Sequence, residues 1–231
     1  MRRFAITDIH GCNTTFGALL DRLQFSPSDQ LYLLGDYVDR GPDSRGVLDR
    51  IFALRENGYQ IHCLSGNHEI MMQTAADDLN ASRLWMMNGG VQTLDSFSVS
   101  TVHEVPDRYW AFLRELPTYL VLEDYILVHA GLDFSTSEPL DDPKSHLWLR
   151  DWYGAIDYAW LGDRIILHGH TPVTRTVIRH QLDLLDRQRY LDLDNGCVLQ
   201  RQRGKGHLVA FDLDQRVPHF QPYEELVASP W

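Results

Sequence analysis

The sequence predicts an α/β fold in which parallel βαβ units lead into two mixed β-sheets flanked by helices. Short apolar, β-branched runs recur along the chain, helical patterns separate the first of them, and a polar side chain follows each run. The alternation of strand and helix is typical of parallel βαβ units, where side chains beyond the carboxyl ends of the strands converge in a crevice. The five runs are residues 4–6, 31–34, 61–64, 126–128 and 165–167.

Two amphipathic helices are predicted between the first three runs. The first has apolar residues at positions 16, 19, 20 and 23, and Asn13 or Thr14 is its expected N-cap. The second has apolar residues at positions 47, 51 and 54, and we expect it to begin at Ser44. Residues 69–118 are predicted to be mainly helical and to frame the entrance to the crevice.

From about Thr171 onward the pattern changes to shorter strands and turns. Alternating apolar positions predict strands that form a mixed second sheet packed on the first. These strands are expected at 173–178, 190–193, 198–199 and 208–213.

The composition is that of a globular protein, with 44% hydrophobic and 23% charged residues. We expect a single domain over residues 1–231, because no linker or repeat divides the chain. No segment approaches the roughly 18 apolar residues of a membrane span, and the N-terminus lacks the apolar core of a secretory signal. The sequence therefore predicts a cytoplasmic protein that does not bind membranes, and it indicates no oligomeric state.

Cysteine content and net charge exclude further classes. Cys12, Cys63 and Cys197 are odd in number and far apart, so they are expected to be free thiols rather than a disulfide framework or thiolate zinc site. The net charge of −11 argues against nucleic-acid binding. An anionic substrate would need strong local positive charge.

The first two strands are followed by motifs rich in carboxylates. In Asp8-Ile9-His10-Gly11, side chains two apart on extended backbone would point to the same side, so Asp8 and His10 could share an ion. A helix cap with a surface histidine is the alternative. The motif at residues 35–41, GDYVDRG, contributes Asp36, Asp39 and Arg40. Its alternative interpretation is a loop with an Asp–Arg pair.

The later strands are followed by amide and imidazole groups. Asn67 offers a neutral carbonyl ligand and His68 an acid or base, although Asn at this place could simply cap a helix. His129 and His170 also follow strands, where a lone histidine is commonly a hydrogen-bonded core residue. All five motifs together form a mixed oxygen and nitrogen set suited to Mn, Fe or Zn, unlike the oxygen-only cages of calcium.

The motifs DIHG, GDYVDRG, GNHE, HAG and GHTP, in this order, resemble the phosphoprotein phosphatase branch of the calcineurin-like metallophosphoesterases. The similarity is greatest to small bacterial and phage serine/threonine phosphatases and runs from Ala5 to about Gly196. It implies a sandwich of two mixed sheets flanked by helices. Thr7 departs from the glycine that the family usually has before the first Asp, and we expect it to crowd the pocket slightly.

The resemblance also implies a role for each motif residue. Asp8 and His10 would bind one divalent ion, Asp36 would bridge two, and the second ion would be held by Asn67, His129 and His170. His68 would be the general acid and Asp39 its orienting partner. Arg40 and Arg150 would bind phosphate oxygens. Both ions are expected to be Mn, with Fe or Zn as alternatives.

Other histidines and tryptophans are expected to have structural roles. His168 is predicted to orient His170 or its strand. The tryptophans, Trp85 among them, are predicted to serve in packing rather than as a stacking platform.

The predicted function is hydrolysis of phosphomonoesters, first of phosphoserine or phosphothreonine in proteins, by in-line attack of a metal-bridging hydroxide. The partner would then be a phosphoprotein or a small phosphoester. A symmetrical diadenosine tetraphosphatase is the nearest alternative, since its relatives share DIHG and a GD-x-x-x-RG motif. Asp39 and Glu69 favour the phosphatase over that class. A non-catalytic phosphate-sensing module is the third possibility, which Asp39 and His68 disfavour because a binding protein needs no general acid.

Overall fold

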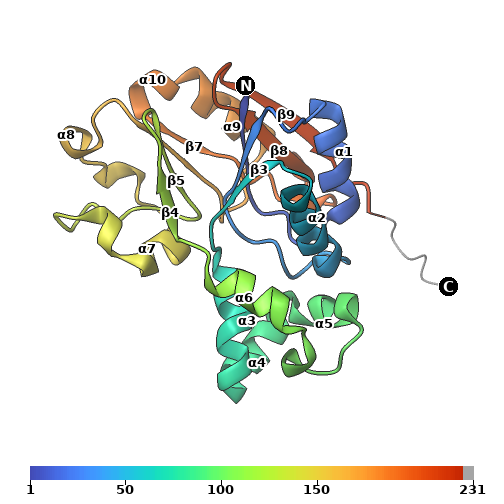
Figure 1. Cartoon of the computed structure of the whole chain (residues 1–231). Coiled ribbons are helices and arrows are strands. Elements are labelled where there is room, and N and C mark those ends of the chain that lie inside the picture. The colour runs from blue at the N-terminus through green and yellow to red at the C-terminus, as the bar shows by residue number, and fades with distance from the viewer. Residues whose placement is uncertain (226–231) are drawn as a thin grey trace.

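Two mixed β-sheets pack face to face in the computed structural model, which describes residues 1–225 (Figure 1). In the first sheet, β1, β2 and β3 run parallel, and β8 and β9 join antiparallel in the order β3-β2-β1-β8-β9. In the second, β5, β6 and β7 run parallel and β4 is antiparallel at the edge. The strands are β1 (Arg3–Ile6), β2 (Gln30–Leu33), β3 (Gln60–Cys63), β4 (Tyr119–Val121), β5 (Tyr125–Val128), β6 (Ile165–His168), β7 (Tyr190–Asp192), β8 (His207–Asp212) and β9 (Val217–Pro222).

Strand alternation explains why the sandwich has separate cores. In β1, Phe4 and Ile6 pack toward the helices, whereas Ala5 faces the other sheet. In β5, Leu127 lies in the core between the sheets and Ile126 in the core on the outer face. Both faces of these strands are apolar because both are covered, as expected for parallel sheets.

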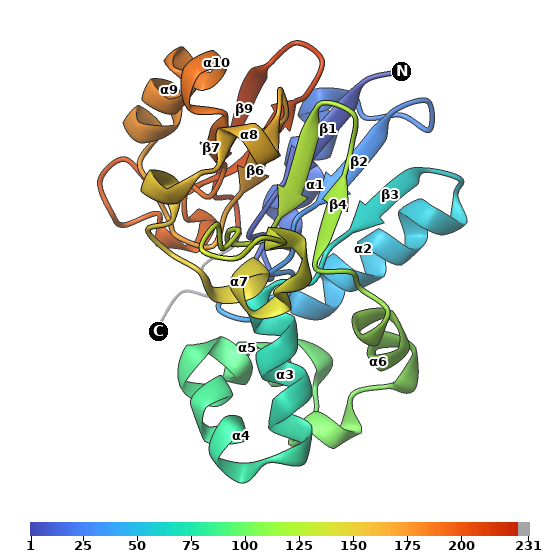
Figure 2. The same ribbon diagram turned by 90° about the vertical axis from the view of Figure 1, so that its left-hand side faces the viewer.

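Helices cover both outer faces and form a separate lobe below the sheets (Figures 1 and 2). α1 and α2 pack on the first sheet, and α3 to α6 form the helical lobe at the end where the site lies. The helices are α1 (Asn13–Leu23), α2 (Ser44–Glu56), α3 (Asn67–Asp77), α4 (Leu79–Trp85), α5 (Val91–Phe97), α6 (Asp107–Arg114), α7 (Pro143–Trp148), α8 (Tyr158–Leu161), α9 (Arg175–Asp183) and α10 (Leu185–Gln188), with a π-helical turn at Met86–Gly90 and 3₁₀ turns at Val102–Glu104, Pro139–Asp141, Tyr153–Ala155 and Cys197–Leu199.

The five predicted strands that carry the motifs are confirmed as β1, β2, β3, β5 and β6, and the two predicted N-terminal helices are α1 and α2. The distribution between sheets differs from the expectation. β5 and β6 belong to the second sheet, while β8, at the predicted strand 208–213, joins the first by pairing with β1. The motifs therefore come from the ends of two facing sheets rather than from one.

Two predicted strands are wrong. Residues 173–178 instead lead into α9, which starts at Arg175, because Ile178 and Gln181 are buried at helical spacing and Thr174 caps the helix with its hydroxyl. The apolar alternation there was too short to reveal the period of 3.6. Residues 198–199 lie in a 3₁₀ turn.

Strand β9 was missed because Pro218 and Pro222 argue against a strand, and proline is tolerated only at a sheet edge, where β9 lies. The predicted cap of α1 is also wrong. Asn13 is already inside the helix, and the carboxylate of Glu225 accepts from the amides of Thr14 and Thr15 instead.

Cys12, Cys63 and Cys197 are buried free thiols, as predicted. Over residues 1–225 we find no helix whose length and hydropathy would allow it to cross a bilayer.

Candidate metal centre

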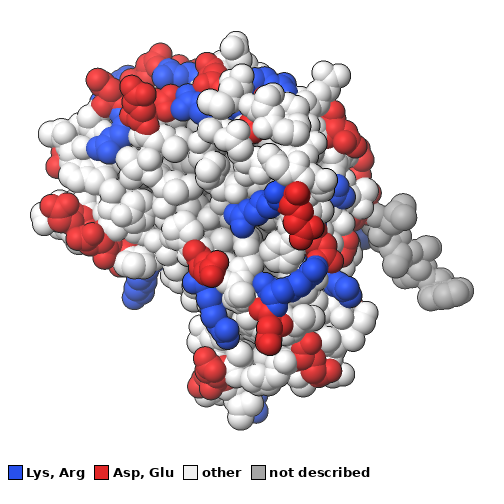
Figure 3. All heavy atoms as spheres, in the orientation of Figure 1, with Lys and Arg blue, Asp and Glu red and all other residues white. Residues whose placement is uncertain are grey.

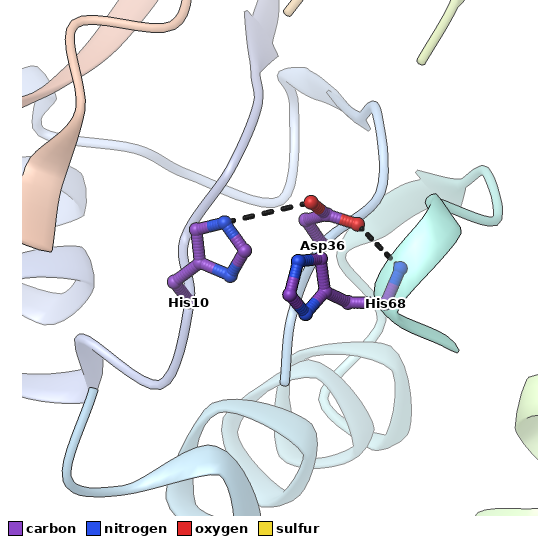
Figure 4. A group of neighbouring side chains, drawn as sticks. All are labelled: His10, Asp36 and His68. Carbon is purple, nitrogen blue, oxygen red and sulfur yellow. Dashed lines mark hydrogen bonds and ion pairs between the residues drawn. The ribbon is translucent and has the colours of Figure 1, made fainter. Parts of the chain in front are cut away.

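The loops that follow β1, β2, β3, β5 and β6 meet where the sandwich borders the helical lobe (Figures 1 and 4). Each predicted metal ligand lies in one of these loops, or at the start of α3, and is at least 93% buried. The structure thus brings all of them together. They are Asp8, His10, Asp36, Asn67, His129 and His170.

The backbone of these loops is left-handed at most of the site residues. Asp8, His10, Asp36 and His170 have φ between 46° and 71°. The extended geometry used to place Asp8 and His10 on one side is therefore wrong, although the two side chains do converge. Non-glycine residues adopt this conformation at a cost, and such strain clusters at functional sites.

Asp8, His10 and Asp36 form the first group of acceptors. His10 Nδ1 lies 3.0 Å from the carbonyl oxygen of Val38, so this nitrogen carries the proton and Nε2 presents its lone pair. That Nε2 is 3.4 Å from Asp36 Oδ2 and 3.8 Å from Asp8 Oδ1. The hydroxyl of Thr7 donates to Asp8 Oδ2, so it helps to hold this carboxylate as well as filling space.

Asn67, His129 and His170 form the second group, which also faces Asp36. His129 donates from Nδ1 to the carbonyl of Leu34 at 3.0 Å, and its Nε2 lies 3.0 Å from Asn67 Oδ1 and 3.5 Å from Asp36 Oδ1. His170 Nδ1 lies 2.9 Å from the same amide oxygen. Asp36 therefore stands between the two groups, with one carboxylate oxygen toward each.

Both groups fit divalent cations. Asp8 Oδ1 and His170 Nε2 are buried and have no hydrogen-bond partner among residues 1–225. Burial raises the pKa of Asp36 well above its usual range, and the charges of Asp8 and Glu69 add to this, while burial lowers the pKa of His170 to about 2. Buried acceptor atoms that converge without enough positive charge nearby are stabilised by cations. Carboxylate, imidazole and amide groups are metal ligands that suit Mn, Fe or Zn.

A guanidinium already faces one of these acceptors. Arg40 Nη1 lies 2.6 Å from His10 Nε2, the lone pair that an ion would take. Arg40 is exposed, so it borders solvent as well as the site. Arg150, also exposed, donates to the hydroxyl of Thr171, the residue after His170. The two predicted phosphate-binding arginines thus border different ligands of the site.

His68 lies beside His10 and Asp36 of the first group (Figure 4), and its side chain is held by a different partner. Its Nδ1 is 2.7 Å from Asp39 Oδ2, and its backbone amide donates to Asp36 Oδ1. Burial would lower the pKa of His68, but the charge of Asp36 and the hydrogen bond to Asp39 outweigh it and raise that pKa. His68 is therefore oriented and favoured as the charged acid.

Asp39 is fixed by two residues whose roles the sequence analysis missed. The indole Nε1 of Trp85 lies 2.9 Å from both carboxylate oxygens, and the hydroxyl of Thr93 donates to Oδ1 at 2.7 Å. Trp85 is fully buried, as predicted for a packing residue, but it is also a donor to the site. No sequence motif marks Trp85 or Thr93, because both lie in the helical lobe, far along the chain from GDYVDRG.

Glu69 has a positioning role that the sequence analysis did not assign. Its buried carboxylate accepts from the backbone amides of Asp36, Tyr37 and Gly66, each at 2.8 Å. These contacts tie the loop after β2 to the loop after β3. A Cβ on Gly66 would come within 2.2 Å of Asp36 Oδ1, so the two loops approach too closely for a side chain there.

His168 makes no hydrogen bond to His170 within the described part of the chain, so the predicted role of orienting His170 is wrong, whereas the alternative role of orienting its own strand stays a prediction. Its Nδ1 lies 3.2 Å from the carbonyl of Gly169, its ring packs edge-on against Trp152, and Nε2 has no partner among residues 1–225. It points toward the outer core of the second sheet because side chains alternate along β6.

Surface charge is mixed on one face of the fold. On the face shown in Figure 3, basic and acidic side chains are interspersed, although the chain carries a net charge of −11. Arg40 and Arg150 place two basic side chains at the site itself.

A buried set of carboxylate, amide and imidazole groups that fits divalent cations, beside an imidazole held by a carboxylate, is the kind of site that metal-dependent hydrolysis of phosphoesters uses. A sequence model described as calcineurin-like phosphoesterase matches residues 1–206. The chain belongs to this family of metallophosphoesterases, which use divalent metal ions.

Two curated relatives are similar over much of the sequence. A symmetrical bis(5'-nucleosyl)-tetraphosphatase of Ectopseudomonas mendocina is 30% identical over 89% of this chain and 74% of its own. One from Erwinia tasmaniensis is 32% identical over 69% of this chain and 60% of its own. The chain thus spans about three quarters of the first relative's length and less than two thirds of the second's.

Solved structures share the fold. One described as a candidate diadenosine tetraphosphatase superposes with a TM-score of 0.64 at 20% identity, covering 97% of this chain and 95% of that one. A protein serine/threonine phosphatase of Saccharomyces cerevisiae gives a TM-score of 0.64 at 15% identity, covering 99% and 82%. At such identities the likeness shows the fold alone.

Proposed function

We propose that this chain hydrolyses phosphate esters or anhydrides with two divalent ions held by the two acceptor groups, and that His68 protonates the departing oxygen. The observation that carries this is the 2.7 Å contact between His68 Nδ1 and Asp39 beside the converging ligands. Bound ions would supply positive charge for phosphate oxygens. They would also lower the pKa of a bound water, so that hydroxide is available as the nucleophile near neutral pH.

The chain's own residues divide the remaining work. Arg40 and Arg150 bind phosphate oxygens with paired donors from different sides of the ligand set. Asp39 holds His68 in one orientation and stabilises its charged form. Glu69 keeps the Asp36 loop in register, so that the carboxylate stays between the two groups.

For the substrate class, the names of the relatives support symmetrical dinucleoside tetraphosphates better than phosphoproteins. The two relatives described above carry that name at 30% and 32% identity. The sequence motifs alone favour a protein phosphatase over this class, through Asp39 and Glu69. We therefore place dinucleoside tetraphosphates first, with cleavage to two nucleoside diphosphates.

A phosphomonoester of serine or threonine is the second candidate, and the geometry at His68 favours it. A serine alkoxide cannot leave unprotonated, whereas a nucleoside diphosphate is a good leaving group. Trp85 and Thr93 both donate hydrogen bonds to Asp39, which in turn orients His68. A well-oriented general acid matters most when the leaving group is poor.

A side-by-side assay with Mn²⁺ tests both candidates. We expect kcat/KM on diadenosine tetraphosphate to exceed that on a phosphoserine peptide and on p-nitrophenyl phosphate by at least about tenfold, with ADP as the only nucleotide product by chromatography. Chelation should abolish all turnover and Mn²⁺ should restore it. Faster cleavage of the peptide would give preference to the second candidate, and full turnover in metal-stripped buffer would refute the two-metal proposal.

A further inference from the structure

A groove of about 540 Å³ begins at Arg40 and lies between the helical lobe and the 3₁₀ turn that contains Leu199. Its lobe side is the π-helical turn Met86–Gly90 and the start of α5. We propose that this groove binds a nucleoside, the part of the substrate that extends from the phosphate held at Arg40. This inference rests on the proposed function and specifies where its substrate lies.

The groove and the phosphate site are joined at Gly89. The carbonyl oxygen of Gly89 accepts from the backbone amide of Arg40 at 3.3 Å. Gly89 has φ of +112°, and a Cβ there would lie 2.4 Å from Arg40 N, so only glycine permits this contact. The chain kinks at Gly89, between α4 and α5. The wall of the groove is therefore held at a fixed position relative to the backbone of Arg40.

The lining of the groove suits a neutral planar group. Met87 is 85% exposed and Val91 is 43% exposed, although both are apolar. A thioether packs well on the face or edge of an aromatic ring. Among the described residues that line the groove, none is acidic and Arg40 alone is basic, in a chain whose net charge is −11.

Two amides provide hydrogen-bonding groups beside these apolar side chains. Asn88 uses its Nδ2 to donate to the carbonyl of Leu84, which leaves its oxygen as an acceptor, and Gln92 lies one turn further at the exposed start of α5. Apolar walls with a few polar groups are typical of small-molecule sites, and the volume falls within their usual range of about 300–1,000 Å³. A purine with its ribose has this chemistry.

The test measures binding without turnover. The Mn²⁺-loaded protein is titrated in a calorimeter with ADP and with pyrophosphate, which share a diphosphate and differ in the nucleoside. We expect wild type to bind ADP at least about tenfold more tightly than pyrophosphate. The double variant Met87→Ala, Val91→Ala should lose most of that preference. Leu79→Ala removes an equally exposed apolar side chain, 81% accessible, outside the groove lining and should retain it.

Equal affinity for ADP and pyrophosphate in wild type, or an undiminished preference in the double variant, would overturn the groove assignment. The assignment would also be overturned if the double substitution weakened binding of a phosphoserine peptide and left binding of ADP unchanged. Because no catalysis is required, a chain that fails to cleave diadenosine tetraphosphate but shows the ADP preference would refute the proposed substrate class and keep the groove. A chain that cleaves diadenosine tetraphosphate but shows no preference for ADP over pyrophosphate would support the proposed substrate class and refute the groove assignment.

Discussion

Asp36→Asn is expected to lose on the order of 10³-fold or more in kcat and to bind fewer than two Mn²⁺ per chain. The carboxylate faces His10 through Oδ2 at 3.4 Å and His129 through Oδ1 at 3.5 Å, so its charge serves both acceptor groups. Bound ions contribute several kcal/mol to stabilising a phosphoryl transition state, and about 1.4 kcal/mol corresponds to tenfold in rate. Elemental analysis of the purified variant, with turnover measured on the same sample, checks this result.

Asp212→Asn is a matched control for that substitution. Asp212 is also buried, and its Oδ1 accepts from the amides of Asp214 and Gln215, an acceptor role that Asn can keep. We expect its metal content and kcat to equal those of wild type. Unchanged metal content in Asp36→Asn would show that Asp36 does not bridge the two ions.

His68→Asn is expected to keep both ions and to lose about 10²- to 10⁴-fold in kcat, the usual contribution of general acid catalysis. The loss should depend on the leaving group, because a phenolate of low pKa departs unprotonated whereas a serine alkoxide cannot. A phosphoserine peptide should therefore slow far more than p-nitrophenyl phosphate. Metal content by elemental analysis and kcat on both substrates provide the measurement.

Asp39→Asn should show a milder version of the same selectivity, since it disturbs His68 without removing it. The assignment of His68 as the acid fails if its variant loses metal. It fails equally if both substrates slow by one factor while chemistry remains rate-limiting.

Much of the fold was predictable because its signals are local. β1, β2 and β3 are short apolar runs separated by amphipathic helices, and parallel pairing follows from that order. The assignment of β8 to the first sheet was not predictable, since its antiparallel pairing with β1 joins segments about 200 residues apart. α9 was mistaken for a strand because Thr and Val have high β-propensity, which packing of Ile178 overrides.

The residues of the site could be predicted from the sequence, but their backbone conformation and contacts could not. The structure brings together all six residues that the motifs predict as ligands, yet the left-handed backbone at Asp8 and His10 has no signal in the sequence. Glu69 lies inside a motif and could have been examined as a backbone acceptor. Trp85 and Thr93 could not have been found, because only tertiary packing brings the helical lobe against Asp39.

Anomalous diffraction from crystals of the wild-type protein grown with Mn²⁺ tests the two-metal site most directly. We predict two peaks about 3.5–4 Å apart, the usual spacing of two-metal sites. One peak should lie against Asp8 and His10 and the other against Asn67, His129 and His170, with Asp36 between them. A single peak within this cluster, or Mn²⁺ bound only elsewhere, would contradict the account.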